Sequence, residues 1–281
     1  MRQDASVASD DVQAIEEAFV AHWANFGLGP GGSYHDDGDL IWIEAPVPQL
    51  PYNAVIRTTL IDDIDDRIGK VTDHFRQRNV NFLWLVHPSA QPVELPAKLT
   101  AHGLALVETA TGMSMELSSW TENRTIATPA VDGPIVYREV ENDADMDAFE
   151  ALMAYYWELP PESRRYAYGI NRWVGLGPNA PGVRWVALMG GEPIGKAYLS
   201  LLGSPDTAAI FGVSVRREAR GRGVATILTE HLVQRAVDLG RRRVVLHSSE
   251  MAVNLYRTMG FVERCALPVY ATGALHTLQT S

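Results

Sequence analysis

The amino-acid sequence predicts two α/β domains, each built of strands layered against helices. At 281 residues the chain exceeds the usual size of one domain. In both halves, short apolar runs alternate with longer segments whose apolar residues recur at helical spacing, the pattern of alternating strands and helices. Residues 118–134 are polar, lack an apolar period and end in Asp-Gly-Pro. We therefore expect domains at 1–120 and 135–281, joined by a linker at 121–134.

In the first domain we expect a helix over residues 11–26, capped by Asp10 or Asp11, and a Gly-rich loop at 27–32. The elements that follow alternate in the order strand, strand, helix, strand, helix, strand, at 40–44, 54–60, 62–78, 82–86, 95–102 and 104–117. The acidic segment at 35–39, His-Asp-Asp-Gly-Asp, is expected to form a turn.

In the second domain a strand precedes two helical segments, at 135–140, 143–156 and 160–181. Two strands then form a hairpin around Gly190-Gly191, at 183–188 and 194–202. The remaining elements alternate from strand to helix and end in a strand, at 208–215, 224–239, 244–247, 250–259 and 261–271. Gly240 is expected to end the helix before it.

Composition predicts a soluble, cytoplasmic globular protein, with 46% apolar and 21% charged residues. No apolar run approaches the ~20 residues of a membrane span, and the N-terminus lacks the apolar core of a secretory signal. The single cysteine, Cys265, excludes an internal disulfide framework and a multi-cysteine metal site. We therefore expect neither a membrane partner nor a bound metal.

The charge is unevenly distributed between the two halves. Residues 1–130 hold 8 Lys and Arg against 18 Asp and Glu, whereas residues 131–281 hold 16 of each. An acidic first half argues against binding to nucleic acid, which depends on clustered basic residues. The acidic surface would either favour a cationic partner or serve solubility alone.

The clearest chemical pattern lies where the strand at 208–215 leads into the next helix. Gly221 and Gly223 allow close approach of the backbone to a ligand, and the N–H groups of a helix start favour an anion. Four arginines add positive charge, at 216, 217, 220 and 222. A nucleotide P-loop is excluded, because Val224 and Ala225 stand where Lys-Ser or Lys-Thr would follow the last glycine. The turn is therefore predicted to hold a pyrophosphate.

The same turn resembles the coenzyme motif of GCN5-related N-acetyltransferases, the GNAT superfamily. The motif, Arg/Gln-x-x-Gly-x-Gly/Ala, is met by Arg220, Gly223 and Ala225. A second segment, Asn254-Leu-Tyr-Arg-Thr-Met-Gly-Phe261, resembles the late motif of that family. The resemblance implies a central mixed, largely antiparallel twisted sheet flanked by helices. Residues 39–117 resemble the first half of tandem GNAT proteins but lack both motifs, which implies a degenerate, non-catalytic copy.

The resemblance also implies a function, transfer of acetyl from acetyl-CoA to a primary amine of a small molecule by direct attack. Tyr256 would protonate the departing thiolate. The strand residues would pair with the pantetheine arm and polarise the thioester carbonyl. The implied coenzyme contacts are Val213, Ser214, Val215, Arg220, Gly221, Arg222, Gly223, Val224, Ala225, Thr226 and Ser249. Tyr155 and Glu158, between the first two helices of the domain, are candidate contacts for the amine.

The sequence departs from the family pattern in two places. The strand at 208–215 carries no acidic residue to serve as a general base, so that role is left to Asp206, Glu250, His247 or a chain of waters. Ser249 stands where the family often has Asn. For Tyr256, His247 and the Tyr155–Glu158 segment, packing is the competing explanation.

Three other functions stay open at this stage. A non-catalytic acyl-CoA-binding or regulatory protein would keep the pyrophosphate turn but release no thiol. A protein N-acetyltransferase would need an open groove for a peptide. Acyl-CoA decarboxylation on the same fold would fit the lack of an evident base. We expect a monomer or a homodimer.

Overall fold

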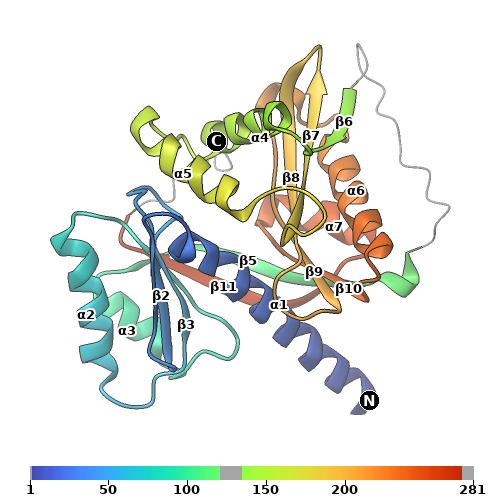
Figure 1. Ribbon diagram of the computed structural model, residues 1–281. Helices are drawn as coiled ribbons and strands as arrows, with labels where there is room; N and C mark the ends of the chain where they lie inside the picture. Colours follow the sequence, from blue (N-terminus) through green and yellow to red (C-terminus); the bar gives the residue numbers. More distant parts are fainter. Residues whose placement is uncertain (1, 121–134, 274–281) are drawn as a thin grey trace. The chain divides into compact units, whose positions relative to one another are not determined.

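The structure is a computed structural model that describes residues 2–120 and 135–273 (Figure 1). As far as its residues are described, the chain forms two compact units, each drawn from several parts of the sequence. The first unit takes Met1–His22, Gly112–Tyr156 and Val174–Arg264, and the second takes Trp23–Thr111, Trp157–Trp173 and Cys265–Ser281. The predicted linker at 121–134 lies outside the described residues, and the predicted domain boundaries stay a prediction.

The first unit is built on a sheet with the strand order β5-β10-β9-β8-β7-β6. Its strands are β5 (Ala105–Glu116, in this unit from Gly112 on), β6 (Ile135–Glu139), β7 (Gly182–Met189), β8 (Glu192–Ser200), β9 (Thr207–Val215) and β10 (Arg243–Ser248). Strands β6 to β9 pair antiparallel with their neighbours, whereas β9 and β10 run parallel. The sheet is therefore mixed and largely antiparallel, as the resemblance implied.

Helices cover both faces of this sheet (Figure 1). They are part of α1 (Arg2–Leu28), α4 (Asp143–Tyr156), α6 (Val224–Asp238) and α7 (Val253–Met259), with 3-10 turns η1 (Leu117–Ser119), η2 (Arg217–Ala219) and η3 (Glu250–Ala252). Since successive strand residues point to opposite faces, Val186 of β7 shares a cluster with Phe149 of α4, and Ala187 shares another with Leu228 of α6. A Cβ at Gly195 of β8 would lie 2.9 Å from Val224 Cγ1, so this glycine permits the close approach of α6.

The second unit has the strand order β1-β2-β3-β4-β11. Its elements are β1 (Ser33–Asp36), β2 (Leu40–Glu44), β3 (Ala54–Thr58), α2 (Ile64–Gln77), β4 (Leu83–Leu85), α3 (Leu95–Ala101), α5 (Pro161–Val174, in this unit up to Trp173) and β11 (Val262–Ala271, in this unit from Cys265 on). Its core includes Phe75 of α2, which stacks on Phe82 with ring centroids 4.5 Å apart, and Trp84 of β4. The apolar stripe of α2, built on Ile68, Val71 and Phe75, is buried as its helical spacing predicts.

Most predicted elements are confirmed within a few residues, but two details were wrong. Helix α1 begins at Arg2, so Asp10 and Asp11 both lie inside the helix and neither caps it; Asp11 is fully buried. The predicted acidic turn at 35–39 begins within β1, which pairs antiparallel with β2. The strand was missed because its sequence, Ser-Tyr-His-Asp, shows no alternation of apolar and polar residues. Backbone pairing with β2 stabilises this short strand, and its side chains are not buried.

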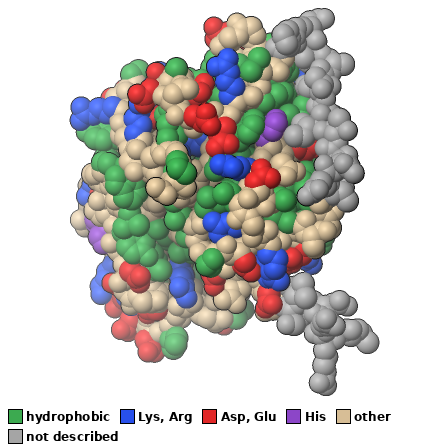
Figure 2. All heavy atoms as spheres, turned by 45° about the vertical axis from the view of Figure 1, so that its right-hand side comes forward, with side chains coloured by type: hydrophobic (Ala, Val, Ile, Leu, Met, Phe, Trp, Pro, Cys, Tyr) green, Lys and Arg blue, Asp and Glu red, His purple; other side chains and the backbone are tan. Residues whose placement is uncertain are grey.

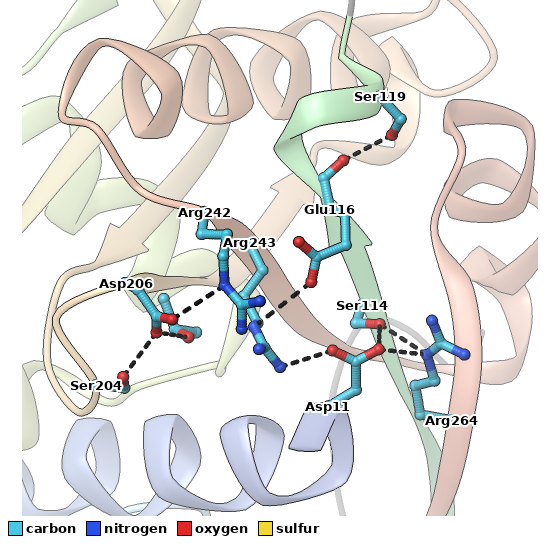
Figure 3. Close-up of polar contacts among 10 residues, drawn as sticks. Asp11, Ser114, Glu116, Ser119, Ser204, Asp206, Arg242, Arg243 and Arg264 are labelled. Carbon is cyan, nitrogen blue, oxygen red and sulfur yellow. Dashed lines mark hydrogen bonds and ion pairs between the residues drawn. The ribbon is translucent and has the colours of Figure 1, made fainter. Parts of the chain in front are cut away.

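Asp11 belongs to a buried polar network in the first unit (Figure 3). Its carboxylate lies 2.7 Å from Arg243 Nη1 at the start of β10 and 2.8 Å from Arg264 Nε of β11. The Ser114 hydroxyl of β5 also donates to Asp11, at 2.9 Å. The network therefore joins α1 to β5, to β10 and to the first residues of β11, Val262–Arg264, which belong to this unit.

The surface shown in Figure 2 intersperses acidic, basic and apolar side chains among the described residues. Among the described helices, none combines the length and apolar character that crossing a bilayer requires. The described residues also bring together no group of three or more His, Cys, Asp or Glu side chains suited to a metal ion.

Candidate functional site

Strands β9 and β10 separate after a short stretch of parallel pairing. The paired residues run from Thr207 with Arg243 to Ile210 with Leu246. Beyond Ile210, in the described part of the chain, the pairing of β9 continues on its β8 side alone, as far as Val215. The strand is buried up to Ile210, whereas Phe211, Gly212 and Val213 are partly or fully exposed. The free edge at 211–215 can therefore pair with an extended ligand as an added strand would.

A bulge deforms β9 beside this edge. The register between β8 and β9 shifts between Lys196 and Tyr198, and Gly212 has a φ of 57°. Lys196, which is 4% exposed, donates from its ammonium group to the Gly212 carbonyl oxygen at 2.9 Å. Burial and the nearby charge of Arg184 lower the pKa of Lys196 to about 7. Bulges redirect the backbone of a strand, and here a buried lysine holds the redirected carbonyl.

The turn after β9 exposes the start of helix α6. Gly221 and Gly223 have φ values of 74° and 77°, and a Cβ at either would meet nothing within 4 Å. These glycines are thus required by the backbone conformation and not by lack of space. Among the described residues, no side chain caps α6 at Gly223. The first amides of the helix, at Val224–Thr226, therefore remain available to an anion.

Arginines surround this helix start. Arg220 Nε donates to the Val215 carbonyl oxygen at 3.4 Å, and Arg222 Nη1 lies 3.9 Å from the Met189 sulfur. The Arg216 guanidinium lies over the Tyr155 ring, 5.1 Å from its centroid. The structure thus brings the predicted segments 213–215 and 220–226 together at one end of β9.

Tyr256 of α7 is connected to the same helix start. Its side chain is 5% exposed and contacts Phe261 edge to face, with ring centroids 5.7 Å apart. Burial raises the pKa of Tyr256, partly offset by a hydrogen bond with the Thr229 side chain, so the phenol stays protonated at neutral pH. The Thr229 hydroxyl donates to the Ala225 carbonyl oxygen at 2.8 Å. Ser249, partly buried, directly follows β10.

Comparison with known proteins assigns this part of the chain to a family. The model of the acetyltransferase (GNAT) family matches residues 146–261, which contain the separating strands, the turn and Tyr256. This stretch is a GNAT domain. A curated relative, N-acetyltransferase family 8 member 2 of Rattus norvegicus, is 36% identical over 90 residues, which are 30% of this chain and 40% of the relative. The chain therefore spans less than half the length of this relative.

Solved structures share the fold over nearly the whole chain. A GCN5-related N-acetyltransferase from Kribbella flavida has a TM-score of 0.63 at 14% identity, covering 91% of this chain and 95% of its own. A tandem GNAT protein from the clavulanic acid biosynthesis pathway has a TM-score of 0.57 at 16% identity, covering 94% of each chain. At such identities the likeness concerns the fold alone, and it confirms the predicted tandem GNAT fold.

Of the three side chains predicted as possible bases of the GNAT domain, only one lies where β9 and β10 separate. Asp206 precedes β9 at its opposite end, and hydrogen bonds with Ser204, Thr207 and Arg242 help to lower its pKa. Glu250 is exposed in η3. His247 directly follows Leu246, the last β10 residue paired with β9, and its ring centroid lies 6.0 Å from that of Phe211.

Several residues at this position were missed by the sequence analysis. His22 of α1 stacks on Phe211, with ring centroids 3.8 Å apart and 10° between the planes. Burial, with the charges of Arg184 and Lys196, lowers the pKa of His22 to about 3, so its ring is neutral at pH 7. The sequence held one local sign of this unusual environment: Lys196 stands within the otherwise apolar run of β8. As for the predicted amine contacts, Tyr155 belongs to the first unit and Glu158 to the second.

Proposed function

We propose that the GNAT domain is an acyl-CoA-dependent N-acyltransferase that moves an acetyl group from acetyl-CoA to the primary amine of a small molecule. One observation carries the proposal: the free edge of β9 is followed, after the arginine-containing turn at 216–223, by the uncapped start of helix α6. Coenzyme A joins an extended amide-containing arm to a pyrophosphate, which fits that order of features. The use of acetyl-CoA by GNAT proteins supports the choice of acyl group.

Each part of the site has a distinct task in this proposal. Acetyl-CoA supplies an acyl group activated as a thioester. The backbone of Val213–Val215 binds the extended arm, and the amides of Val224–Thr226 with Arg220 and Arg222 hold the pyrophosphate. Tyr256 holds a proton for the departing sulfur, and His247 accepts the proton that the amine loses.

Calorimetry with acetyl-CoA tests the coenzyme part of the proposal. We expect saturable binding that weakens at least tenfold in Arg222→Ala, because a guanidinium that contacts the pyrophosphate is lost. Arg242→Ala is the matched control, since Arg242 pairs with Asp206 at the other end of β9 and is 55% exposed. Absence of binding heat at millimolar acetyl-CoA would refute the proposal.

Release of free CoA with a panel of amines tests the transfer itself. The near-complete burial of Tyr256 favours one rival function, a non-catalytic acyl-CoA-binding protein in which Tyr256 only packs. Under the proposed function, Tyr256→Phe lowers kcat without changing the Kd of acetyl-CoA. Under the rival, wild-type protein binds acetyl-CoA but releases no CoA with any amine of the panel.

A further inference from the structure

The side chain of Lys196 joins helix α4 to the backbone of β9. Strand β8, which carries Lys196, lies between β7 and β9 in the sheet (Figure 1). The Lys196 ammonium lies 4.9 Å from the ring centroid of Phe149, a buried residue of α4. It also donates to the Gly212 carbonyl oxygen at 2.9 Å. Two contacts therefore hold the end of this side chain, one with a helix and one with a single peptide group of β9.

That peptide group belongs to the bulge of β9. The pairing of β8 and β9 shifts there by one residue, so that Gly212 and Val213 both stand opposite Ala197. The extra residue of a bulge is left out of the regular ladder, and here the Lys196 side chain supplies a hydrogen bond to its carbonyl. A Cβ at Gly212 would lie 3.0 Å from Lys196 Nζ, so even an alanine would press on the amine.

The direction of the Gly212 carbonyl determines the direction of the next amide. The bond between Gly212 and Val213 is trans. A trans peptide group is planar, and its C=O and N–H point in opposite directions. Because Lys196 holds the carbonyl on its own side, the Val213 N–H points away from Lys196.

The Val213 amide also faces the free edge of β9. The Arg216 N–H donates to the carbonyl oxygen of Ile194 in β8, at 2.8 Å. Hydrogen-bonded and non-hydrogen-bonded residues alternate along an antiparallel pair, so the amides of Val215 and Val213 face away from β8. The Val215 carbonyl oxygen agrees with this direction, because it accepts from Arg220 Nε in the turn that follows the strand.

Building on the proposed function, in which Val213–Val215 bind the arm of acetyl-CoA, we propose that Lys196 is a positioning residue for the thioester. Through the Gly212 carbonyl it aims the Val213 N–H at the thioester oxygen. A hydrogen bond to the oxygen of a peptide group also polarises that group and strengthens its N–H as a donor. The thioester oxygen gains negative charge as the amine attacks, and a donor already aimed at it lowers the barrier. Lys196 itself acts through the backbone and touches neither substrate.

Infrared spectroscopy of bound acetyl-CoA tests the proposal without knowledge of the acceptor amine. With acetyl-CoA isotopically labelled at the acetyl carbonyl, we expect the thioester band of the bound form at lower frequency than in solution, because an accepted hydrogen bond weakens the C=O bond. In Lys196→Met, which keeps the apolar stem and removes the donor, the band should return toward its solution position. Lys70→Met makes the same change at an exposed position of α2 and is the matched control, with the wild-type band expected.

CoA release and calorimetry give a second readout. Loss of one oxyanion donor lowers kcat by about 10²–10³-fold. A donor that is kept but aimed less well should lose part of this, so we expect kcat to fall at least tenfold in Lys196→Met. The Kd of CoA, which lacks the acyl group, should stay within about twofold of wild type, because only the hydrogen bond to the acyl oxygen is affected. A lysine that only packs against α4 would leave kcat of the folded variant unchanged.

Gly212→Ala keeps the test open if Lys196→Met does not fold. Gly212 is exposed, and the added methyl group would displace Lys196 Nζ from the carbonyl. Gly190→Ala is its control, since Gly190 in the β7–β8 turn has a similar φ of 60° and a Cβ there would meet nothing within 4 Å. We expect the infrared shift to diminish in Gly212→Ala alone.

Three results would overturn the inference: no shift of the thioester band in wild type, the wild-type band and kcat in Lys196→Met, or the wild-type band in Gly212→Ala. Acetyl-CoA binding and CoA release by wild type would then leave the proposed function standing. Wild type that binds no acetyl-CoA would remove the proposed function itself.

Discussion

Replacing Asp11 by Asn tests how strongly the buried ion-pair network stabilises the first unit. The carboxylate is 0% exposed, and the side chains of Arg243 and Arg264 are 6% and 23% exposed. Asn preserves the shape but removes the charge that both guanidiniums share. Loss of one partner of a buried pair costs about 3–5 kcal/mol, because the remaining charge stays buried without compensation. Since Arg264 reaches solvent and Glu116 lies 3.7 Å from Arg243, we expect the lower end, about 3 kcal/mol.

The measurement is the free energy of unfolding in urea, with Asp10→Asn as the matched control. Asp10 neighbours Asp11 on the same helix and is exposed, so the same chemical change should stay within about 0.5 kcal/mol of wild type. Hydrogen exchange of the α1 amides should accelerate in Asp11→Asn alone. If both variants unfold at the same urea concentration as wild type, the network does not hold the helix and the reasoning fails.

Three further predictions concern the site. Tyr256→Phe should lower kcat by about 10²-fold and leave the Kd of acetyl-CoA unchanged. Assays of CoA release measure kcat and calorimetry measures the Kd; an unaltered kcat would exclude the proton-donor role. Gly223→Ala should cost about 1 kcal/mol of stability and weaken acetyl-CoA binding, because its φ of 77° disfavours a Cβ although space is open; unchanged stability and affinity would contradict this. The pKa of Lys196 falls from 10.5 to about 7 on folding, so between those pH values the unfolded chain binds more protons and stability should rise with pH, by at most about 1.4 kcal/mol per unit. Lys196→Met should lack this rise in melting experiments at pH 7, 8 and 9, and parallel slopes would argue against a protonation change at Lys196.

The sequence predicted those parts of the fold that depend on local patterns. Helical spacing placed α2 and α6, and a diglycine turn placed the β7–β8 hairpin. The turn before α6 was also predictable, since its glycines and arginines and the helix start are contiguous in the sequence. Helix α1 was predicted but its start was missed, so Asp10 or Asp11 was taken for its cap. The buried ion pair between Asp11 and Arg243 could not be predicted, because the two residues are far apart in the sequence.

The group of rings where β9 and β10 separate could not be predicted from sequence, because its residues meet only through the fold. His22, Phe211 and His247 are separated by long stretches of chain, and each by itself is compatible with ordinary packing. The propensity of residues to form strands predicts that β9 and β10 exist. It does not predict at which residues their mutual hydrogen bonding ends. Lys196 interrupts an apolar strand. Lysine is seldom buried, so its position in the sequence alone indicated an unusual environment.

The interleaving of the two units has a consequence for synthesis and for the choice of expression fragments. Because the first unit contains both Met1–His22 and Val174–Arg264, a ribosome must translate nearly the whole chain before that unit can be completed. A truncated gene beginning at residue 135 would encode the entire family match yet omit the segment that carries Asp11. Such a product would leave Arg243 and Arg264 without the Asp11 carboxylate that pairs with both, so we expect it to be less stable than the full chain.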